Sequence, residues 1–138
     1  MNDLHAVYAA AEYHVGSFLL RVDAPHAKWD QWLRDNGHYC FAIVTAHNPG
    51  SQPCEPAQNH RAQLSLQSIV RQLAWQWRFG VNRDPVSAWP DEPAVCVLNQ
   101  ELDHVLSLAE TYKQSAIVFG KRTARGAIVP RLVFVQER

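Results

Sequence analysis

The stretch "YCFAIVTAHNPGSQPCEPAQNHR", residues 39–61, decides the fold class of this chain. It opens on a continuous apolar run, as expected of a strand that is covered on both faces. Prolines, a glycine and polar residues then interrupt the strand. A helix is expected from about residue 58, because apolar residues recur along it at spacings of three, four and seven: Leu66, Ile69, Val70 and Leu73. A buried strand that leads through a polar loop into an amphipathic helix predicts an α/β domain.

The rest of the chain alternates between helical and extended patterns. Further helices are expected over residues 4–11 and 23–37, and after a cap at Asn99. Further strands are expected over residues 13–22, 75–81, 94–98, 115–119 and 127–135. The sequence predicts one domain over residues 1–138, of the α/β class or the related α+β class. Its core would be a mixed sheet of about five or six strands with three or four helices packed on it.

Three of these strands carry finer expectations. A change of phase at Gly16-Ser17 predicts a bulge in the strand over 13–22. In the strand over 75–81, alternation predicts one buried face, made of Trp75, Trp77, Phe79 and Val81. Pro130 lacks a backbone N–H, so it favours an edge position or a bulge for the last strand.

Composition narrows the function classes. Thirteen basic and thirteen acidic residues cancel, so the chain has no overall positive field to attract nucleic acid. No apolar run approaches the roughly 18 residues of a membrane-spanning helix, and the first residues do not resemble a secretory signal. Three cysteines, Cys40, Cys54 and Cys96, do not form an even disulfide framework. These features predict a cytoplasmic protein that binds neither membrane nor nucleic acid.

Four short motifs occur in a fixed order along most of the chain. They are "TAHNP" at 45–49, "NHR" at 59–61, "WPDEP" at 89–93 and "QSAIV" at 114–118. Together they resemble a bacterial family catalogued as domain of unknown function 3293. The resemblance implies no reaction. It implies that the polar residues of these four motifs belong together in the fold.

The polar residues around the loop at 45–61 are the first candidates for a binding site: Thr45, Asn48, Asn59 and Arg61. Ligands of α/β proteins bind beyond the carboxyl ends of strands, in the loops that lead into helices. Arg61 could hold a phosphate or carboxylate with its planar guanidinium group. The alternative is structural: Asn-Pro-Gly is common turn chemistry, Asn59 could cap the helix, and Arg61 could pair with Glu55 or Glu92.

Two other motifs supply candidates from elsewhere in the chain. Glu92 is the candidate general acid or base, because a carboxylate shielded by Trp89 would have a raised pKa. Its alternative role is a salt bridge or a backbone cap. Trp89 is the candidate for stacking on a ligand. Gln114 would orient a ligand or tie down the adjacent loops.

His47, Cys54 and His60 are residue types that can bind a metal ion. The spacing matches neither a paired-cysteine site nor a helical His-x-x-x-His pair, so no metal is predicted. Cys54 as a nucleophile would need a lowered pKa, for which the sequence gives no sign.

Two functions of different classes therefore stand. The first is a pocket on the loop at 45–61 for a small polar ligand, anionic or nucleotide-like, with transfer or hydrolysis as the reaction if the chain is an enzyme. The second is a non-catalytic protein-interaction or regulatory module, in which the same polar residues form a buried network that fixes the loops.

Overall fold

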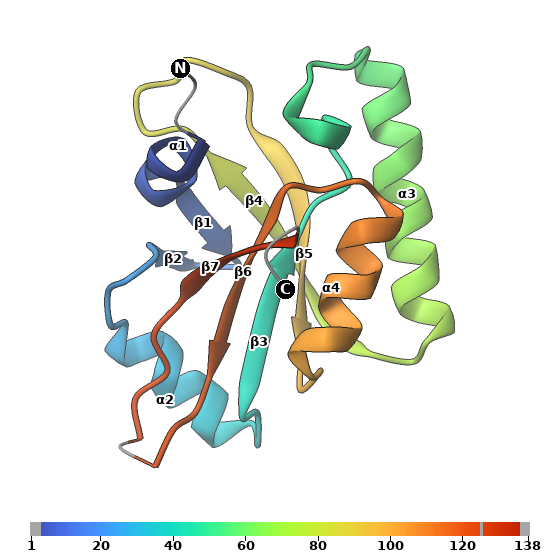
Figure 1. Cartoon of the computed structure of the whole chain (residues 1–138). Helices are drawn as coiled ribbons and strands as arrows, with labels where there is room; N and C mark the ends of the chain where they lie inside the picture. The colour runs from blue at the N-terminus through green and yellow to red at the C-terminus, as the bar shows by residue number, and fades with distance from the viewer. Residues whose placement is uncertain (1–3, 125, 136–138) are drawn as a thin grey trace.

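The computed structural model describes residues 4–124 and 126–135. The helices in these residues are α1 (Leu4–Ala10), α2 (Ala27–Asp35), α3 (Pro56–Gln72) and α4 (Leu102–Thr111), with a short 3-10 turn, η1 (Pro49–Ser51). The strands are β1 (Glu12–Val15), β2 (Phe18–Leu20), β3 (Cys40–Val44), β4 (Gln76–Arg83), β5 (Glu92–Leu98), β6 (Ala116–Lys121) and β7 (Arg131–Phe134). These elements form one α+β domain (Figure 1), which confirms the predicted class.

The seven described strands form a single sheet in the order β2-β1-β4-β5-β3-β6-β7. Every neighbouring pair is antiparallel, so the expected mixed sheet is wrong. The segment from β3 to β6 has the βαββαβ connectivity of ferredoxin-like domains. In it, α3 and α4 each connect two strands that run in the same direction. One antiparallel strand separates the members of each such pair, which is why no parallel pairing results.

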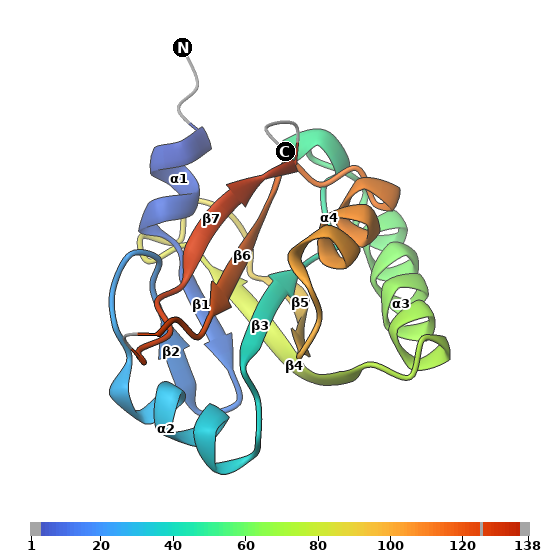
Figure 2. The same ribbon diagram turned by 60° about the horizontal axis from the view of Figure 1, so that its bottom comes forward.

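The central strands are covered on both faces. The views in Figures 1 and 2 place α3 and α4 on one side of the sheet and α1 and α2 on the other. Side chains of β3 alternate between the two cores: Ala42 and Val44 pack in the α3/α4 core, and Phe41 and Ile43 in the core that contains Trp29 of α2. All five residues of β3 are buried. Two-sided burial explains its uninterrupted apolar sequence.

The sheet curls so that its two outer strands approach each other. The backbone N–H of Asp23, which follows β2, donates to the carbonyl oxygen of Pro130, which precedes β7, at 2.7 Å. At one end α1 packs against β7, where the rings of Tyr8 and Phe134 have centroids 6.3 Å apart. The curl gives the sheet a concave face, which is the face opposite α3 and α4 (Figure 2).

The extra strands relative to the prediction come from the N-terminal segment. Residues 13–22 form two strands, β1 and β2, joined by a two-residue turn, and the pairing of Val15 with Phe18 closes the hairpin. Gly16 adopts φ 57°, a left-handed conformation that glycine accepts readily. The predicted bulge is therefore wrong. A tight turn shifts the phase of an alternating pattern just as a bulge does, so the pattern alone does not distinguish the two. The final strand is at an edge, as Pro130 predicted.

Two further expectations need correction. Asn99 does not cap α4, whose N-cap is Glu101. The Asn99 side chain instead accepts the backbone N–H of Tyr39 at 2.9 Å and bonds to His38 at 3.0 Å, which ties β3 to β5. The alternation on β4 is present, but Phe79 is 63% exposed. The helices cover β4 only in part, so the tryptophan face is not buried along its whole length.

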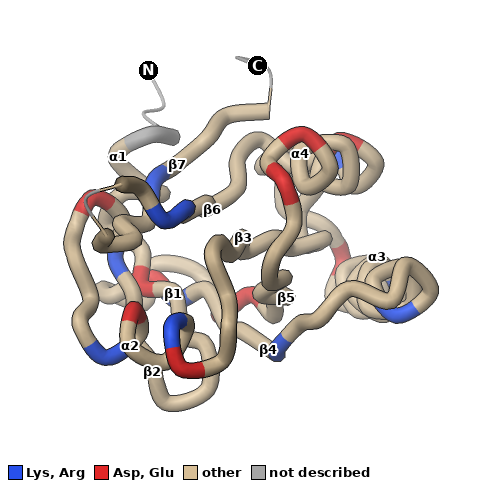
Figure 3. The backbone as a smooth tube through the Cα atoms, turned by 90° about the horizontal axis from the view of Figure 1, so that it is seen from below, with Lys and Arg blue, Asp and Glu red and all other residues tan. Residues whose placement is uncertain are grey.

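The distribution of charged residues and the lengths of the helices are both in line with the sequence. Basic and acidic positions are interspersed around the described chain (Figure 3). No helix among the described residues is long and apolar enough to cross a membrane.

Candidate functional site

The end of β3 is anchored to the start of β5 by Thr45. Its hydroxyl donates to the carbonyl oxygen of Pro93 at 2.7 Å and accepts the backbone N–H of His47 at 3.1 Å. The first bond joins two segments far apart in the sequence, and the second is local to the loop. Thr45 therefore sets the direction in which the loop after β3 leaves the sheet.

Asn48 is the centre of that loop. It adopts a left-handed backbone conformation, φ 49° and ψ 62°, which asparagine tolerates better than most residues. Its side-chain oxygen accepts the backbone N–H of Cys54 at 3.1 Å and the amide of Asn59 at 2.8 Å. Asn59 returns a bond, since its oxygen accepts the backbone N–H of Asn48 at 2.8 Å. This reciprocal pair holds the loop against the first turns of α3.

The same asparagine reaches the sheet through Glu92. Its amide nitrogen donates to Oε2 of Glu92 at 2.9 Å. Burial raises the pKa of the Glu92 carboxyl, and the hydrogen bond from Asn48 opposes the rise in part. A carboxyl group whose pKa is raised in this way is suited to general acid or base chemistry. The predicted raised pKa of Glu92 is thus reproduced, with desolvation as its main cause.

A cavity of about 290 Å³ lies on the concave face, beside Glu92. Its apolar wall comes from α1, its following residue and three strands, and contains Val7, Ala11, Ile43, Val118 and Leu132. Its polar wall contains one residue of α1, residues in or next to the strands, and the loop after β3: Tyr8, Tyr13, Thr45, His47, Asn48, Ser51, Asn82, Arg83, Glu92 and Gln114. An apolar interior with a few polar groups at one side is typical of a site for a small molecule.

A second cavity of about 450 Å³ lies on the side of α3. The two cavities share four lining residues: His47, Asn48, Pro53 and Glu92. Since Asn48 and Glu92 line both and are hydrogen-bonded to each other, their bond forms part of the wall between the cavities. Asn59, Cys54 and His60 line only the second.

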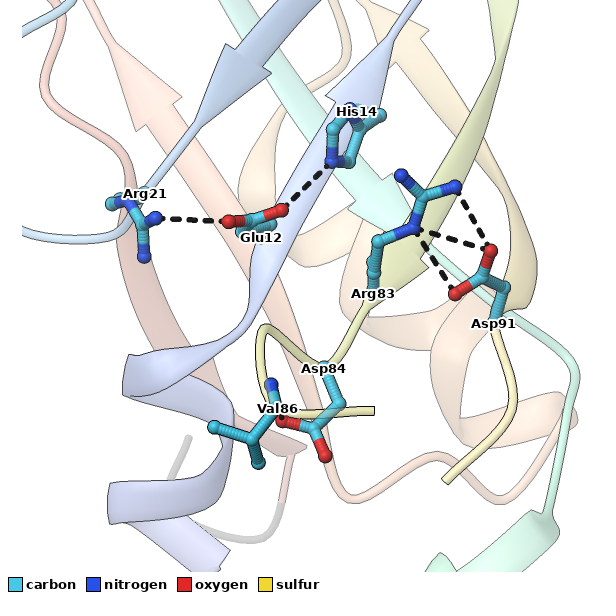
Figure 4. Close-up of polar contacts among 7 residues, drawn as sticks. All are labelled: Glu12, His14, Arg21, Arg83, Asp84, Val86 and Asp91. Carbon is cyan, nitrogen blue, oxygen red and sulfur yellow. Dashed lines mark hydrogen bonds and ion pairs between the residues drawn. The ribbon is translucent and has the colours of Figure 1, made fainter. Parts of the chain in front are cut away.

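The loop between β4 and β5 borders the first cavity and is fixed by charged residues (Figure 4). Arg83 binds Asp91 through two nitrogens, with distances of 3.0 and 3.2 Å. Asp84 accepts the backbone N–H groups of Val86 at 3.3 Å and Ala88 at 2.6 Å. These bonds close the loop and place Trp89 in the cavity lining.

On the neighbouring strands of the same close-up, Glu12 binds both His14 and Arg21 (Figure 4). Arg21 donates to Oε2 of Glu12 at 2.9 Å, and His14 lies 3.1 Å from Oε1. These contacts tie β1 to the residue that follows β2, and none of the three residues lines either cavity.

Three buried polar atoms at the cavities have no hydrogen-bond partner among the described residues: Oδ1 of Asn82, Nε2 of His47 and Nε2 of Gln63. Asn82 lines the first cavity, Gln63 the second, and His47 both. An unpaired buried polar group costs free energy, so buried groups are nearly always bonded to protein or to ordered water. These three atoms are therefore available to bond to water or to another molecule in the cavities.

The predicted site residues are brought together only in part. Thr45, Asn48, Trp89, Glu92 and Gln114 line the first cavity. Asn59 does not line the first cavity, but it is hydrogen-bonded to Asn48, which does. Asn59 itself lines the second cavity. Gln114 donates to the carbonyl oxygens of His47 at 3.1 Å and Tyr112 at 3.2 Å, so it ties down the loop.

Arg61 lies apart from this group. It is exposed on α3 and lines neither cavity, and no ion pair joins it to Glu55 or Glu92. The alternative salt bridge of Arg61 is therefore not formed.

Sequence reasoning missed Tyr8, Tyr13, Ser51 and Asn82 as lining residues. Asn82 could have been found, because it lies on the polar side of the alternating β4 pattern, which faces the concave side of the sheet. Tyr8 and Ser51 could not, because they come from separate segments and meet only in the folded chain, with their hydroxyl oxygens 2.6 Å apart.

His47, Cys54 and His60 do come together, as lining residues of the second cavity. Burial lowers the pKa of the His47 imidazole, and the nearby His60 lowers it further. Within residues 4–124 and 126–135, no three histidine, cysteine or acidic side chains are arranged to hold a metal ion.

Comparison with known families gives one match. The family described as "Protein of unknown function (DUF3293)" matches residues 44–117, which is just over half of the chain and contains the loop after β3, Glu92 and Gln114. Comparisons with curated proteins and with solved structures give no match.

Proposed function

This chain belongs to the family described as protein of unknown function DUF3293, and we propose that it binds a small molecule in the cavity on the concave face of its sheet. The observation that carries the proposal is the cavity itself. Its volume of about 290 Å³ is close to the lower end of the range for small-molecule sites, roughly 300–1,000 Å³. An apolar wall for the body of a ligand and polar groups for its head are both present.

The charge of the lining changes the ligand class expected from the sequence. An anionic or nucleotide-like ligand was expected because Arg61 would hold it, but Arg61 lies outside the lining. Arg83 does line the cavity, yet its guanidinium is already bound to Asp91. Burial lowers the pKa of His47 and so favours its neutral form. These charges support a neutral or cationic ligand.

Glu92 would be the acid or base if the bound molecule reacts. Its pKa is raised by burial, one carboxylate oxygen is held by Asn48, and it lies in the cavity lining. Proton transfer to or from a ligand is the chemistry that such a carboxyl group supports. A transferase or hydrolase reaction would use it in this role.

The non-catalytic alternative explains part of the same cluster. Thr45, Asn48 and Asn59 satisfy one another and the nearby backbone, as a structural network would. That alternative gives no reason for the unpaired oxygen of Asn82 in the cavity. We therefore assign the asparagine pair to loop structure and the cavity to ligand binding.

We also propose a cytoplasmic location. Cys40 and Cys96 are free thiols buried in the core, and burial raises the pKa of both. Buried free thiols of this kind are common in proteins of reducing compartments. Localisation of a tagged chain by cell fractionation would test this, and recovery outside the cytoplasm would refute it.

A thermal-shift screen tests the binding proposal. A ligand that binds the folded state raises its melting temperature. Ala116 lies on the same face of β6 as Val118 and lines the cavity, so Ala116→Leu would fill part of it. The matched control is Ala57→Leu on the exposed side of α3. We expect small neutral or cationic compounds to stabilise the wild type and the control but not Ala116→Leu. Equal stabilisation of all three proteins would refute the site.

A further inference from the structure

Three side chains form a row across neighbouring strands of the concave face. Tyr13 of β1 pairs with Asn82 of β4, and Asn82 pairs with Glu92 of β5. Residues directly opposite each other in an antiparallel sheet point to the same face, with Cβ atoms roughly 4.5–5.5 Å apart. All three line the cavity. The row therefore places an amide next to a carboxyl group, both directed into the same space.

Hydrogen bonds within the protein leave acceptors free in this row. The hydroxyl of Tyr13 donates to the carbonyl oxygen of Tyr8 at 2.8 Å, so its hydrogen is already used. Oδ1 of Asn82 is buried and accepts no bond from the described residues. Glu92 accepts from Asn48 through Oε2, and no described residue donates to its other oxygen. Two neighbouring oxygens thus have room for donors that a ligand would bring.

The charges around the row favour a cation. Glu92 is the acidic residue of the lining, and the guanidinium of Arg83 is bound to Asp91. A partly buried carboxylate without a cationic partner is costly, and a positively charged donor would offset that cost. Such a donor would also satisfy the acceptor of Asn82.

We propose that the cavity binds a small organic cation with N–H donors, such as a protonated primary amine, with its nitrogen between Glu92 and Asn82. Its apolar body would lie against Ile43, Val118 and Leu132. The proposal rests on the proposed function and narrows it from a small molecule to an amine.

Three probes of equal chain length separate the two proposals: hexylamine, 1-hexanol and hexanoate at pH 7, titrated into the protein by calorimetry. They share an apolar body and differ in the head group. We expect hexylamine to bind about tenfold or more tightly than hexanol, because hydrogen bonds to a charged group are stronger than neutral ones. Hexanoate should bind weakest, because its charge has the same sign as that of Glu92.

Variants of the lining residues show which side chains cause the preference for hexylamine. Glu92→Gln keeps an acceptor for Asn48 and removes the charge, so it should abolish the preference for hexylamine over hexanol. Asn82→Ala should weaken hexylamine by severalfold. Glu101→Gln, an exposed carboxyl outside the lining, is the control and should change nothing.

The outcomes distinguish the two proposals. Equal binding of hexylamine and hexanol by the wild type would overturn the amine proposal and leave the binding site in place. Tightest binding of hexanoate would likewise overturn the amine proposal and leave the binding site in place. If none of the three probes binds, the amine proposal and the binding function both fail. The comparison of probes on the wild type does not depend on whether a variant folds.

Discussion

The role of Asn48 can be tested by replacing it with alanine. Asn48→Ala removes three side-chain hydrogen bonds, those to Cys54, Asn59 and Glu92. Each is worth about 1 kcal/mol net. Alanine at φ 49° costs about 1 kcal/mol more, because its Cβ is crowded in the left-handed region. We therefore expect a loss of roughly 3–4 kcal/mol from the free energy of unfolding.

That loss is large for a domain whose total stability is about 5–15 kcal/mol. Urea denaturation followed by tryptophan fluorescence would measure it as a lower midpoint with an unchanged slope. Asn48→Gly separates the two contributions, because glycine loses the same hydrogen bonds without the backbone penalty. It should be about 1 kcal/mol less destabilising than alanine.

The matched control is Asn36→Ala. Asn36 is an exposed asparagine after α2 with one side-chain hydrogen bond, to the carbonyl oxygen of Trp32 at 2.8 Å. Its φ is −105°, where alanine is unstrained. We expect a loss of about 1 kcal/mol or less there. If Asn48→Ala costs no more than Asn36→Ala, the network does not hold the loop and the structural assignment of Asn48 is refuted.

Three further predictions concern the surrounding residues. Burial raises the pKa of Glu92 above its ordinary value of 4.5, so its contribution to stability is greatest below pH 4.5 and is lost as pH rises through the folded pKa. Glu92→Gln should therefore raise the urea midpoint at pH 7 more than at pH 4, and an equal effect at both pH values would contradict this. Thr45→Val removes the bond to Pro93 and should cost about 1–2 kcal/mol by the same assay; an unchanged midpoint would count against it. Gly120→Ala would place a Cβ 2.6 Å from Phe41 and should lower stability by about 1–3 kcal/mol in thermal melts; a stabilised protein would show that the core has spare room.

The sequence was a good guide wherever the fold depends on local periodicity. The apolar run of β3 and the stripe of α3 each predicted their element, because two-sided burial and helical spacing leave direct marks in the sequence. Pro130 predicted an edge strand for the same kind of reason, since a residue without an N–H cannot donate to a neighbouring strand.

Features that depend on distant segments were not predictable in this way. The phase shift at Gly16 fits a bulge and a hairpin equally, and only the pairing of β1 with β2 in the folded chain shows which is formed. Alternation on β4 showed two faces but not which helices would cover them, so Phe79 was wrongly expected to be buried. Whether the folded chain brings together two polar residues from different loops is likewise a tertiary property. Asn48 and Glu92 meet, and Arg61 meets neither.

The cavity also has a consequence for the order of folding. Its walls come from both ends of the described chain, since α1 supplies Val7 and Tyr8 while β7 supplies Leu132. The hydrogen bonds among the strands of the βαββαβ segment do not involve those ends, but the cavity is complete only when the ends meet. Contacts between segments far apart in sequence are the slowest to form, because closing the long intervening loop costs entropy. A ligand that needs the complete cavity would thus recognise only chains that have finished folding.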